Sequence, residues 1–437
     1  MPHLPHGRGL WFLLLLLVAC KAPPAGVPAV PVVPASFQMT TTVLARGESQ
    51  KMVVLAHRLD ARTLVVDAQD VHRMSTDDGA TWSDSRGLPP QRELAFAVFA
   101  GSVHLLRLLR QPQDPVRSSL LHRTVDSDTE RVAFQLEPPQ RGYIDEPALT
   151  SLPDGLLATF TLRRSDKDSR LHALRWTGES GWVQLGVIPG AALHSNLHAA
   201  SLVSDARGNA YVAFVYDPGF DPDSTSHRPG ERPLSLVLMR SRDQGASWQV
   251  VARDLSARAC PPGMEVGMLM DVRLVMSPEG ALTVYWKQDN RDVSLLLMRD
   301  VTQKQLMVSR SADGEHWSAP QRLEDADLKT TRPFFEDFPV NNIEEVRQSA
   351  THAVFGSSPN GRSQVVFWRD ARHGAARLFL RASRDGGRSW TPVTPVEPER
   401  SALAWPGAAL PTDAGPIHLF WVGDDGTANH TVAQVTP

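Results

Sequence analysis

The phrase STDDGATW at Ser75–Trp82 recurs as SRDQGASW at Ser241–Trp248, as SRDGGRSW at Ser383–Trp390 and, one residue shorter, as SADGEHW at Ser311–Trp317. In the pattern S-x-D-x-G-x-x-W, the Asp carboxylate can accept hydrogen bonds from backbone N–H groups of its own turn, and the Ser hydroxyl can do so more weakly. The Gly permits a positive φ, and the Trp is large enough to anchor the turn in an apolar layer. Four copies at long intervals, each after a β-rich run, predict a repeat architecture.

A second repeat accompanies the first. Alternating apolar segments flank tight turns that contain glycine, which is the pattern of β-hairpins. The turn glycines are Gly101, Gly155, Gly208, Gly280, Gly361 and Gly415. Weaker versions of the turn phrase lie at Thr124–Phe134 and Arg175–Trp182, and the stretch from Lys51 to Ser75 adds a further hairpin and a third strand.

These repeats predict an all-β propeller of four-stranded blades in which the turn phrase joins the two outer strands. Seven blades are favoured, and six are possible if the first and last units share one blade. The segment FQMTTTV (Phe37–Val43) can complete the last blade from the N-terminal side. Such closure removes the exposed edges of an open array.

The first twenty residues have the features of an export signal. Arg8 supplies a positive charge, and Leu10–Val18 is an apolar run too short to span a bilayer. The run ends in LVAC at residues 17–20, which resembles a bacterial lipobox with Cys20 as the lipidated residue; an ordinary secretory peptide is the alternative. The lipobox implies a lipid-anchored protein of the bacterial cell envelope, and Lys21 after the cysteine favours the outer membrane.

A proline-rich segment, APPAGVPAVPVVPA, follows at residues 22–35. Prolines favour an extended chain without internal hydrogen bonds. We therefore expect a signal peptide at residues 1–20, a semi-rigid tether at residues 21–36 and a single propeller domain at residues 37–437.

The composition argues against several classes of function. The chain has 45 Lys and Arg against 48 Asp and Glu, with a net charge of −3, so nothing indicates nucleic acid binding. If Cys20 carries lipid, Cys260 is the only other cysteine and the body has no intramolecular disulfide. His194 and His198 have an i,i+4 spacing that suits zinc on a helix but not on a strand. We therefore expect no metal and no cofactor.

The turn phrase resembles the Asp box, or bacterial neuraminidase repeat, of sialidase-like β-propellers. The stretch DEPALTSLPDGLLATFTLRR (Asp145–Arg164) is similar to the sialidase segment in which Glu-Pro precedes an Asp-Gly hairpin and an arginine follows. The resemblance implies that Glu146 partners a tyrosine nucleophile and that Arg163 or Arg164 lies near the substrate carboxylate. Sialidases hold that carboxylate with three arginines and depart from the usual two-carboxylate scheme of glycosidases.

Parts of the family's catalytic set have no counterpart in this chain. The Arg-Ile-Pro phrase is absent from residues 52–63, and Trp405 stands where a tyrosine is expected before the last hairpin. Tyr143 is the one tyrosine in a loop that leads into a blade beside a glutamate. A base within hydrogen-bond reach could activate it, and Glu146 is the candidate.

Loops that lead into the innermost strands carry further polar residues, which would surround one cleft suited to a sugar or a peptide if these loops open at one face. The candidates for ligand binding are Arg141, Asp145, His194, Asn196, His198, Asp271, Arg273, Glu345 and Arg347. The favoured function is a membrane-anchored propeller that binds a glycan or a protein at the mouth of its channel. The alternative is an exo-α-sialidase-type glycoside hydrolase with Glu146, Tyr143 and Arg163 as catalytic residues.

Overall fold

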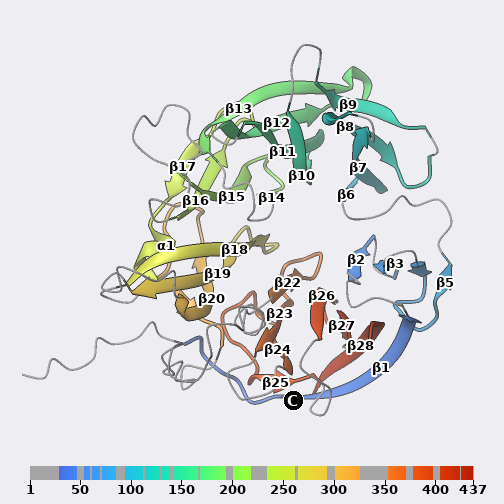
Figure 1. Cartoon of the computed structure of the whole chain (residues 1–437), viewed down its shortest axis with the longest axis vertical. Helices are drawn as coiled ribbons and strands as arrows, with labels where there is room; N and C mark the ends of the chain where they lie inside the picture. Colours follow the sequence, from blue (N-terminus) through green and yellow to red (C-terminus); the bar gives the residue numbers. More distant parts are fainter. Residues whose placement is uncertain are drawn as a thin grey trace, which may run out of the picture.

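Seven antiparallel sheets of four strands each form the blades of a ring (Figure 1). The computed structural model describes residues 29–46, 54–59, 62–68, 71–84, 94–111, 114–127, 129–136, 142–165, 168–192, 200–217, 234–260, 264–292, 301–324, 353–370, 377–396, 404–423 and 425–436. The prediction of an all-β propeller is confirmed, with seven blades rather than six. No helix in these ranges is long and apolar enough to cross a membrane.

Six blades each consist of four consecutive strands, ordered from the innermost to the outermost (Figure 1). Blade 1 contains β2 (Val54–Arg58), β3 (Leu64–Ala68), β4 (Val71–Ser75) and β5 (Ser83–Asp84). Blade 2 contains β6 (Leu94–Phe99), β7 (Ser102–Gln111), β8 (Asp114–Thr124) and β9 (Arg131–Gln135). Blade 3 contains β10 (Tyr143–Leu152), β11 (Gly155–Ser165), β12 (Asp168–Trp176) and β13 (Trp182–Ala192).

The next three blades repeat this order. Blade 4 contains β14 (Ser201–Ser204), β15 (Ala210–Tyr216), β16 (Ser235–Ser241) and β17 (Gln249–Ala252), and it is followed by the short helix α1 (Leu255–Arg258). Blade 5 contains β18 (Met264–Met276), β19 (Leu282–Asp292), β20 (Val301–Ser311) and β21 (Gln321–Arg322). Blade 6 contains β22 (Ala353–Ser357), β23 (Gln364–Asp370), β24 (Arg377–Ser383) and β25 (Thr394–Pro395).

Blade 7 combines the two ends of the chain. Its strands are β26 (Trp405–Pro411), β27 (Ile417–Val422), β28 (Thr427–Thr436) and, outermost, β1 (Ser36–Arg46). β1 runs antiparallel to β28, with Ser36 opposite Thr436. The predicted role of Phe37–Val43 in completing the last blade is therefore confirmed. By pairing with β28, β1 joins the two ends of the chain in one blade and closes the ring.

The end of the proline-rich segment packs against the propeller. Val30 is buried, and its N–H donates to the Arg322 carbonyl of blade 5 at 3.0 Å. The N–H of Val33 donates to the Trp390 carbonyl of blade 6 at 2.8 Å, and the N–H of Trp390 donates to the Pro31 carbonyl at 2.9 Å. Residues 29–33 thus form a strap across blades 5 and 6, so a free spacer is limited to the residues before Ala29. Residues 21–28 of the expected tether lie outside the described ranges.

The apolar core lies between neighbouring blades. One cluster joins blades 4 and 5 and includes Leu238, Trp286 and Met307, which are essentially inaccessible to solvent. Another joins blades 2 and 3, where the ring centroids of Phe134 and Phe160 are 4.6 Å apart. Burial of a side chain of this size stabilises the fold by about 1.5–3 kcal/mol. The stability of the ring therefore depends on contacts between blades.

The four S-x-D-x-G-x-x-W phrases, which we call the repeat turns, join the third and fourth strands of blades 1, 4, 5 and 6, as predicted. The carboxylate Oδ1 of Asp243 accepts from the Ser247 N–H at 2.8 Å, and the Ser241 hydroxyl accepts from the Gly245 N–H at 2.7 Å. Gly245 has a φ of 94°. The turn in blade 1 repeats these bonds around Asp77, whose pKa is lowered to about 2, first by the hydrogen bond from the Thr81 hydroxyl.

The repeat-turn glycines also contact the preceding blade. A Cβ on Gly314 in blade 5 would lie 2.5 Å from the Tyr211 ring of blade 4, and a Cβ on Gly245 in blade 4 would lie 2.6 Å from Leu157 of blade 3. No real Cβ atom approaches that closely. The sequence explains these glycines by turn geometry alone. The structure adds that the absence of a Cβ leaves room for a side chain of the preceding blade.

Gly155, one of the hairpin glycines, begins β11 without a positive φ. It is needed because a Cβ there would lie 1.9 Å from the Trp176 carbonyl oxygen of β12. Close approach of two backbones, rather than turn geometry, explains this residue.

Two blades contain stacked pairs of buried histidines at equivalent positions. Nδ1 of His104 lies 3.0 Å from Nε2 of His122 in blade 2, and Nδ1 of His418 lies 3.0 Å from Nε2 of His430 in blade 7. Their rings are nearly parallel, at 5° and 6°. Burial lowers the pKa of His122 and His418 to about 4, so these rings are neutral at pH 7.

Candidate functional site

The predicted site residues divide between the described and undescribed parts of the chain. Six are described: Tyr143, Asp145, Glu146, Arg163, Asp271 and Arg273. Outside the described ranges lie Arg141, His194, Asn196, His198, Glu345, Arg347 and the lipidation candidate Cys20. The first four described residues share blade 3, and the other two lie on β18 of blade 5.

A β-bulge places Glu146 on β10, the innermost strand of blade 3 (Figure 1). The register against β11 shifts between Asp145 and Ala148. Pro147 has no N–H to give to the ladder, which explains the interruption. Glu146 adopts a φ of 54°, a left-handed conformation that is uncommon for a residue with a Cβ. Strain of this kind costs about 1–3 kcal/mol and gathers at functional sites.

The Glu146 carboxyl has a raised pKa. Burial, as the larger cause, and the negative charge of the adjacent Asp145 together raise it from 4.5 to about 7. A carboxyl with this pKa is partly protonated at neutral pH, so it can donate as well as accept a hydrogen bond. A shift caused by burial together with a specific charge is typical of functional sites.

Tyr143 and Arg163 are directly opposite each other on β10 and β11. Opposed residues have Cβ atoms about 4.5–5.5 Å apart, so both side chains leave the same side of the sheet. Tyr143 is 42% exposed, and Arg163 is half-buried. Tyr143 begins β10 and therefore lies at the face of the ring away from the hairpin turns; we call this the loop face and the opposite side the turn face. Tyr143, Asp145, Glu146 and Arg163 together form the Glu146 site.

Blade 5 repeats the bulge with a second carboxylate. The register of β18 against β19 shifts between Met270 and Arg273, and Asp271 has a φ of 53°. Arg273 is exposed. Burial lowers the pKa of His57 on β2 to about 4, and the positive charge of Arg273 contributes. Residues from the innermost strands of blades 5 and 1 are thus close enough to interact electrostatically around the axis. The sequence analysis did not identify His57 as a candidate. The one feature that could have indicated it is a titratable side chain within the strand VLAHR.

The two candidate arginines that the structure describes, Arg163 and Arg273, lie at different depths in the ring. Arg163 is eight positions after Gly155, where β11 starts at the turn face, whereas Arg273 is three positions before Met276, where β18 ends at that face. At a rise of about 3.3 Å per residue, their depths from the turn face differ by roughly 16 Å. These backbone positions argue against a clamp in which both arginines bind one substrate carboxylate.

Trp405, at the position where a tyrosine nucleophile is expected, packs against another side chain. Trp405 begins β26, and the guanidinium of Arg369 lies over its ring, 4.8 Å from the centroid. An indole ring has no hydroxyl that could attack a sugar.

In the described ranges, no three His, Cys, Asp or Glu side chains are grouped so that they could hold a metal ion.

No protein-family model matches the chain, and no curated protein matches its sequence. Among solved structures, the chain is similar to a protein of unknown function from Dyadobacter fermentans, with 12% identity and a TM-score of 0.44 over 92% of this chain and 99% of that one. It is similar to an α-L-arabinanase from Penicillium chrysogenum, with 14% identity and a TM-score of 0.40 over 78% and 93%. It is also similar to the polysaccharide lyase Uly1, with 13% identity and a TM-score of 0.44 over 95% and 91%. At these identities the likeness concerns the fold alone.

Proposed function

We propose that this protein is an exported β-propeller that binds a glycan at the Glu146 site and does not cleave it. The observation that carries the proposal is the bulge at Glu146, which holds a strained, partly protonated carboxyl beside Asp145. Sugar hydroxyls both donate and accept hydrogen bonds, and this pair of acids can do the same. The exposed ring of Tyr143 offers an apolar surface next to the polar groups, a combination typical of small-ligand sites.

Two features support binding without hydrolysis. Trp405 replaces the expected tyrosine nucleophile and packs under Arg369. The separation in depth between Arg163 and Arg273 argues against a shared arginine clamp. A site can keep the groups that bind a sugar while lacking those that attack it, because one fold hosts many functions.

A glycan array followed by titration calorimetry tests the proposal. We expect a saturable glycan ligand whose affinity falls at least tenfold in Glu146→Gln, because the amide cannot take both protonation states. The matched control is Glu130→Gln, which changes an acid in blade 2 that pairs with Arg107. The proposal is wrong if the array shows no ligand, or if both variants bind equally well. A pull-down in the same series identifies a protein ligand in place of a glycan.

The second candidate is a glycoside hydrolase of the exo-α-sialidase type. It is favoured by the raised pKa of Glu146, which suits an acid or base working near pH 7. Incubation with a fluorogenic sialoside decides between the two. Release of the fluorophore by the wild type and not by Glu146→Gln would establish the hydrolase and overturn binding without cleavage.

Attachment to the envelope by lipid on Cys20 is part of the proposal and is supported by the LVAC phrase at residues 17–20. The strap at residues 29–33 leaves only a few residues between Cys20 and the body. Phase partitioning with a nonionic detergent tests the anchor. The wild type should enter the detergent phase and Cys20→Ser should stay in the aqueous phase, whereas equal partitioning contradicts lipidation.

A further inference from the structure

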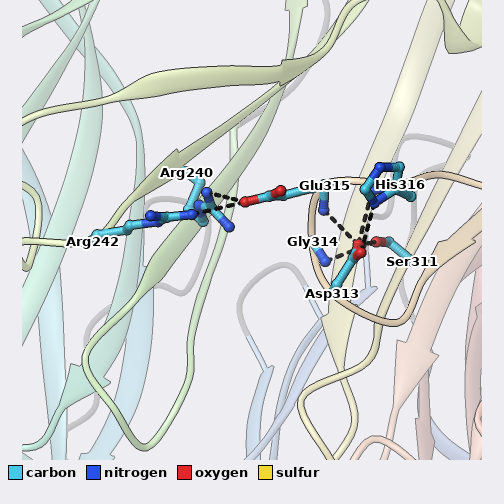
Figure 2. A network of polar contacts seen from close by, with 7 residues as sticks. All are labelled: Arg240, Arg242, Ser311, Asp313, Gly314, Glu315 and His316. Atoms are coloured by element: carbon cyan, nitrogen blue, oxygen red, sulfur yellow. Dashed lines mark hydrogen bonds and ion pairs between the residues drawn. The ribbon is translucent and has the colours of Figure 1, made fainter.

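Adjacent repeat turns meet through charged side chains at the junction of blades 4 and 5. Arg240 immediately precedes the repeat-turn serine of blade 4, and Glu315 immediately follows the repeat-turn glycine of blade 5. Nη2 of Arg240 lies 2.6 Å from Oε1 of Glu315, and Nη2 of Arg242 lies 2.8 Å from the same oxygen. Figure 2 shows both arginines directed toward this carboxylate. These bonds, first the one from Arg240, lower the pKa of Glu315. The arginine charge at this junction therefore has a carboxylate partner.

The next junction has the opposite charge at the same position. Arg310 immediately precedes the repeat-turn serine of blade 5, as Arg240 does in blade 4, but Arg388 occupies the place of Glu315 after the glycine of blade 6. Arg310 donates to the Gly387 carbonyl and, at 2.9 Å, to the Gln321 side-chain oxygen. Both acceptors are neutral. Burial lowers the pKa of Arg310; the negative charge of Asp385 opposes this shift, and the positive charge of Arg388 adds to it.

A cavity of about 420 Å³ lies where these two blades meet on the turn face. Arg384 borders it and donates to the carbonyls of Thr412 and Gly415 at 3.0 and 2.5 Å, which satisfies hydrogen bonds without balancing the charge. Arg362 is paired with Glu279 at 3.1 Å. The remaining acid, Asp385, accepts within its own repeat turn from Ser383 and Ser389. Four arginines and two acids line the cavity, so it carries excess positive charge.

We propose that this cavity is an anion-binding site for an oxyanion of the phosphate or sulfate class. Guanidinium groups bind such oxyanions through paired N–H donors, and an anion would relieve the repulsion between Arg310 and Arg388. The volume lies within the usual range for small-molecule sites and exceeds that of a bare ion, so the oxyanion carries a substituent. The source is a soluble phosphorylated or sulfated compound or a lipid headgroup. The site lies on the face opposite the Glu146 site and is independent of glycan binding there.

Calorimetric titration of the full chain with inorganic phosphate and with sulfate, against chloride at equal ionic strength, tests the site. The key variant is Arg388→Glu, which recreates at this junction the ion pair that Arg240 and Glu315 form at the previous one. We expect saturable binding by the wild type, at least a tenfold loss of affinity in Arg388→Glu, and a melting temperature no lower than that of the wild type. Arg242→Ala is the control and should bind like the wild type.

Two results would overturn the proposal: no saturable binding of either anion by the wild type, or affinities of the wild type and Arg388→Glu that agree within twofold. Glycan binding measured on the same samples should be equal in both proteins, so failure of this site is distinguishable from failure of the Glu146 site.

Sedimentation with phosphatidylglycerol and phosphatidylcholine vesicles distinguishes the sources, using the Cys20→Ala background to remove lipidation. Binding to phosphatidylglycerol vesicles that Arg388→Glu abolishes identifies a headgroup. Anion binding without vesicle binding supports the soluble source. Vesicle binding that survives Arg388→Glu rules out the headgroup at this cavity.

Discussion

The repeat turns and the Glu146 site lie at opposite faces of the ring, and they shift the pKa of a carboxyl group in opposite directions. In the repeat turn of blade 1, Asp77 is surrounded by donors that lower its pKa to about 2. In the Glu146 site, burial and a neighbouring acid raise the pKa of Glu146 to about 7. Positive φ occurs at Asp78 and Gly79 in the turn, and at Glu146, within a β-bulge, in the site. Hydrogen bonds therefore keep the acid of the turn ionised, whereas burial and a like charge keep the acid of the site partly protonated.

If the repeat turns are structural, the largest effect should come from Gly387→Ala. Gly387 has a φ of 81°, and a Cβ there would lie 2.6 Å from Oε1 of the buried Gln364 in the same blade and 3.2 Å from the Tyr285 hydroxyl of blade 5. We expect a loss of about 3 kcal/mol in the free energy of unfolding, from backbone strain and overpacking together. Urea denaturation measures it.

Gly386→Ala is the matched control in the same turn. Gly386 has a φ of 73° with nothing within 4 Å of the added Cβ, so only the backbone strain of about 1–2 kcal/mol applies. Equal losses in the two variants would show that contact between blades does not depend on the turn glycine.

The next effect should be a gain in stability at the Glu146 site. Because the folded pKa of Glu146 lies above its ordinary value, the folded state binds more protons between about pH 4.5 and 7, and stability falls as the pH rises through that range. Glu146→Gln removes this loss and should stabilise the protein at pH 8 by on the order of 2 kcal/mol while weakening ligand binding. Stability that falls equally in both proteins as the pH rises would show that Glu146 is an ordinary surface acid.

A smaller effect is expected on the acid side, from the histidine pairs. The folded pKa of His122 is about 4, below its ordinary value, so the unfolded state binds more protons between pH 6.5 and 4 and stability falls as the pH drops. His122→Gln should reduce this loss by about 1 kcal/mol while leaving the alkaline side of the profile unchanged. An unchanged acid side would contradict the assignment. Melting temperatures across the pH range give both sides in one experiment.

The fold could be predicted because its determinants are local. An Asp, a Ser and a Gly within eight residues make their hydrogen bonds with one another, as Ser241 and Asp243 do, so the sequence contains the whole motif. The closure by β1 was also predictable, from its alternating pattern and the missing strand in the last unit. The contact between Gly314 and Tyr211 was not, because those residues are 103 positions apart and only the ring brings them together.

The site could be predicted only in part, since it depends on which strands face the axis and at what depth. The Glu-Pro pair identified Glu146 through its resemblance to the sialidase segment, and the interruption of the ladder by proline is what the structure adds. The different depths of Arg163 and Arg273 follow from registers that no single-strand pattern contains. The charge reversal between Glu315 and Arg388 was visible in the sequence, yet its meaning required the contacts that Arg240 and Arg310 make with the following blade.

The central claim is that Glu146 is a partly protonated acid that binds a ligand. Carbon-13 NMR titration of its side-chain carboxyl, identified by comparison with Glu146→Gln, measures this directly in the free protein and with a saturating glycan. We predict a titration midpoint near pH 7 in the free protein and a clear displacement of that midpoint when the glycan binds. A midpoint near 4.5, or a midpoint that the bound glycan leaves unchanged, would contradict it.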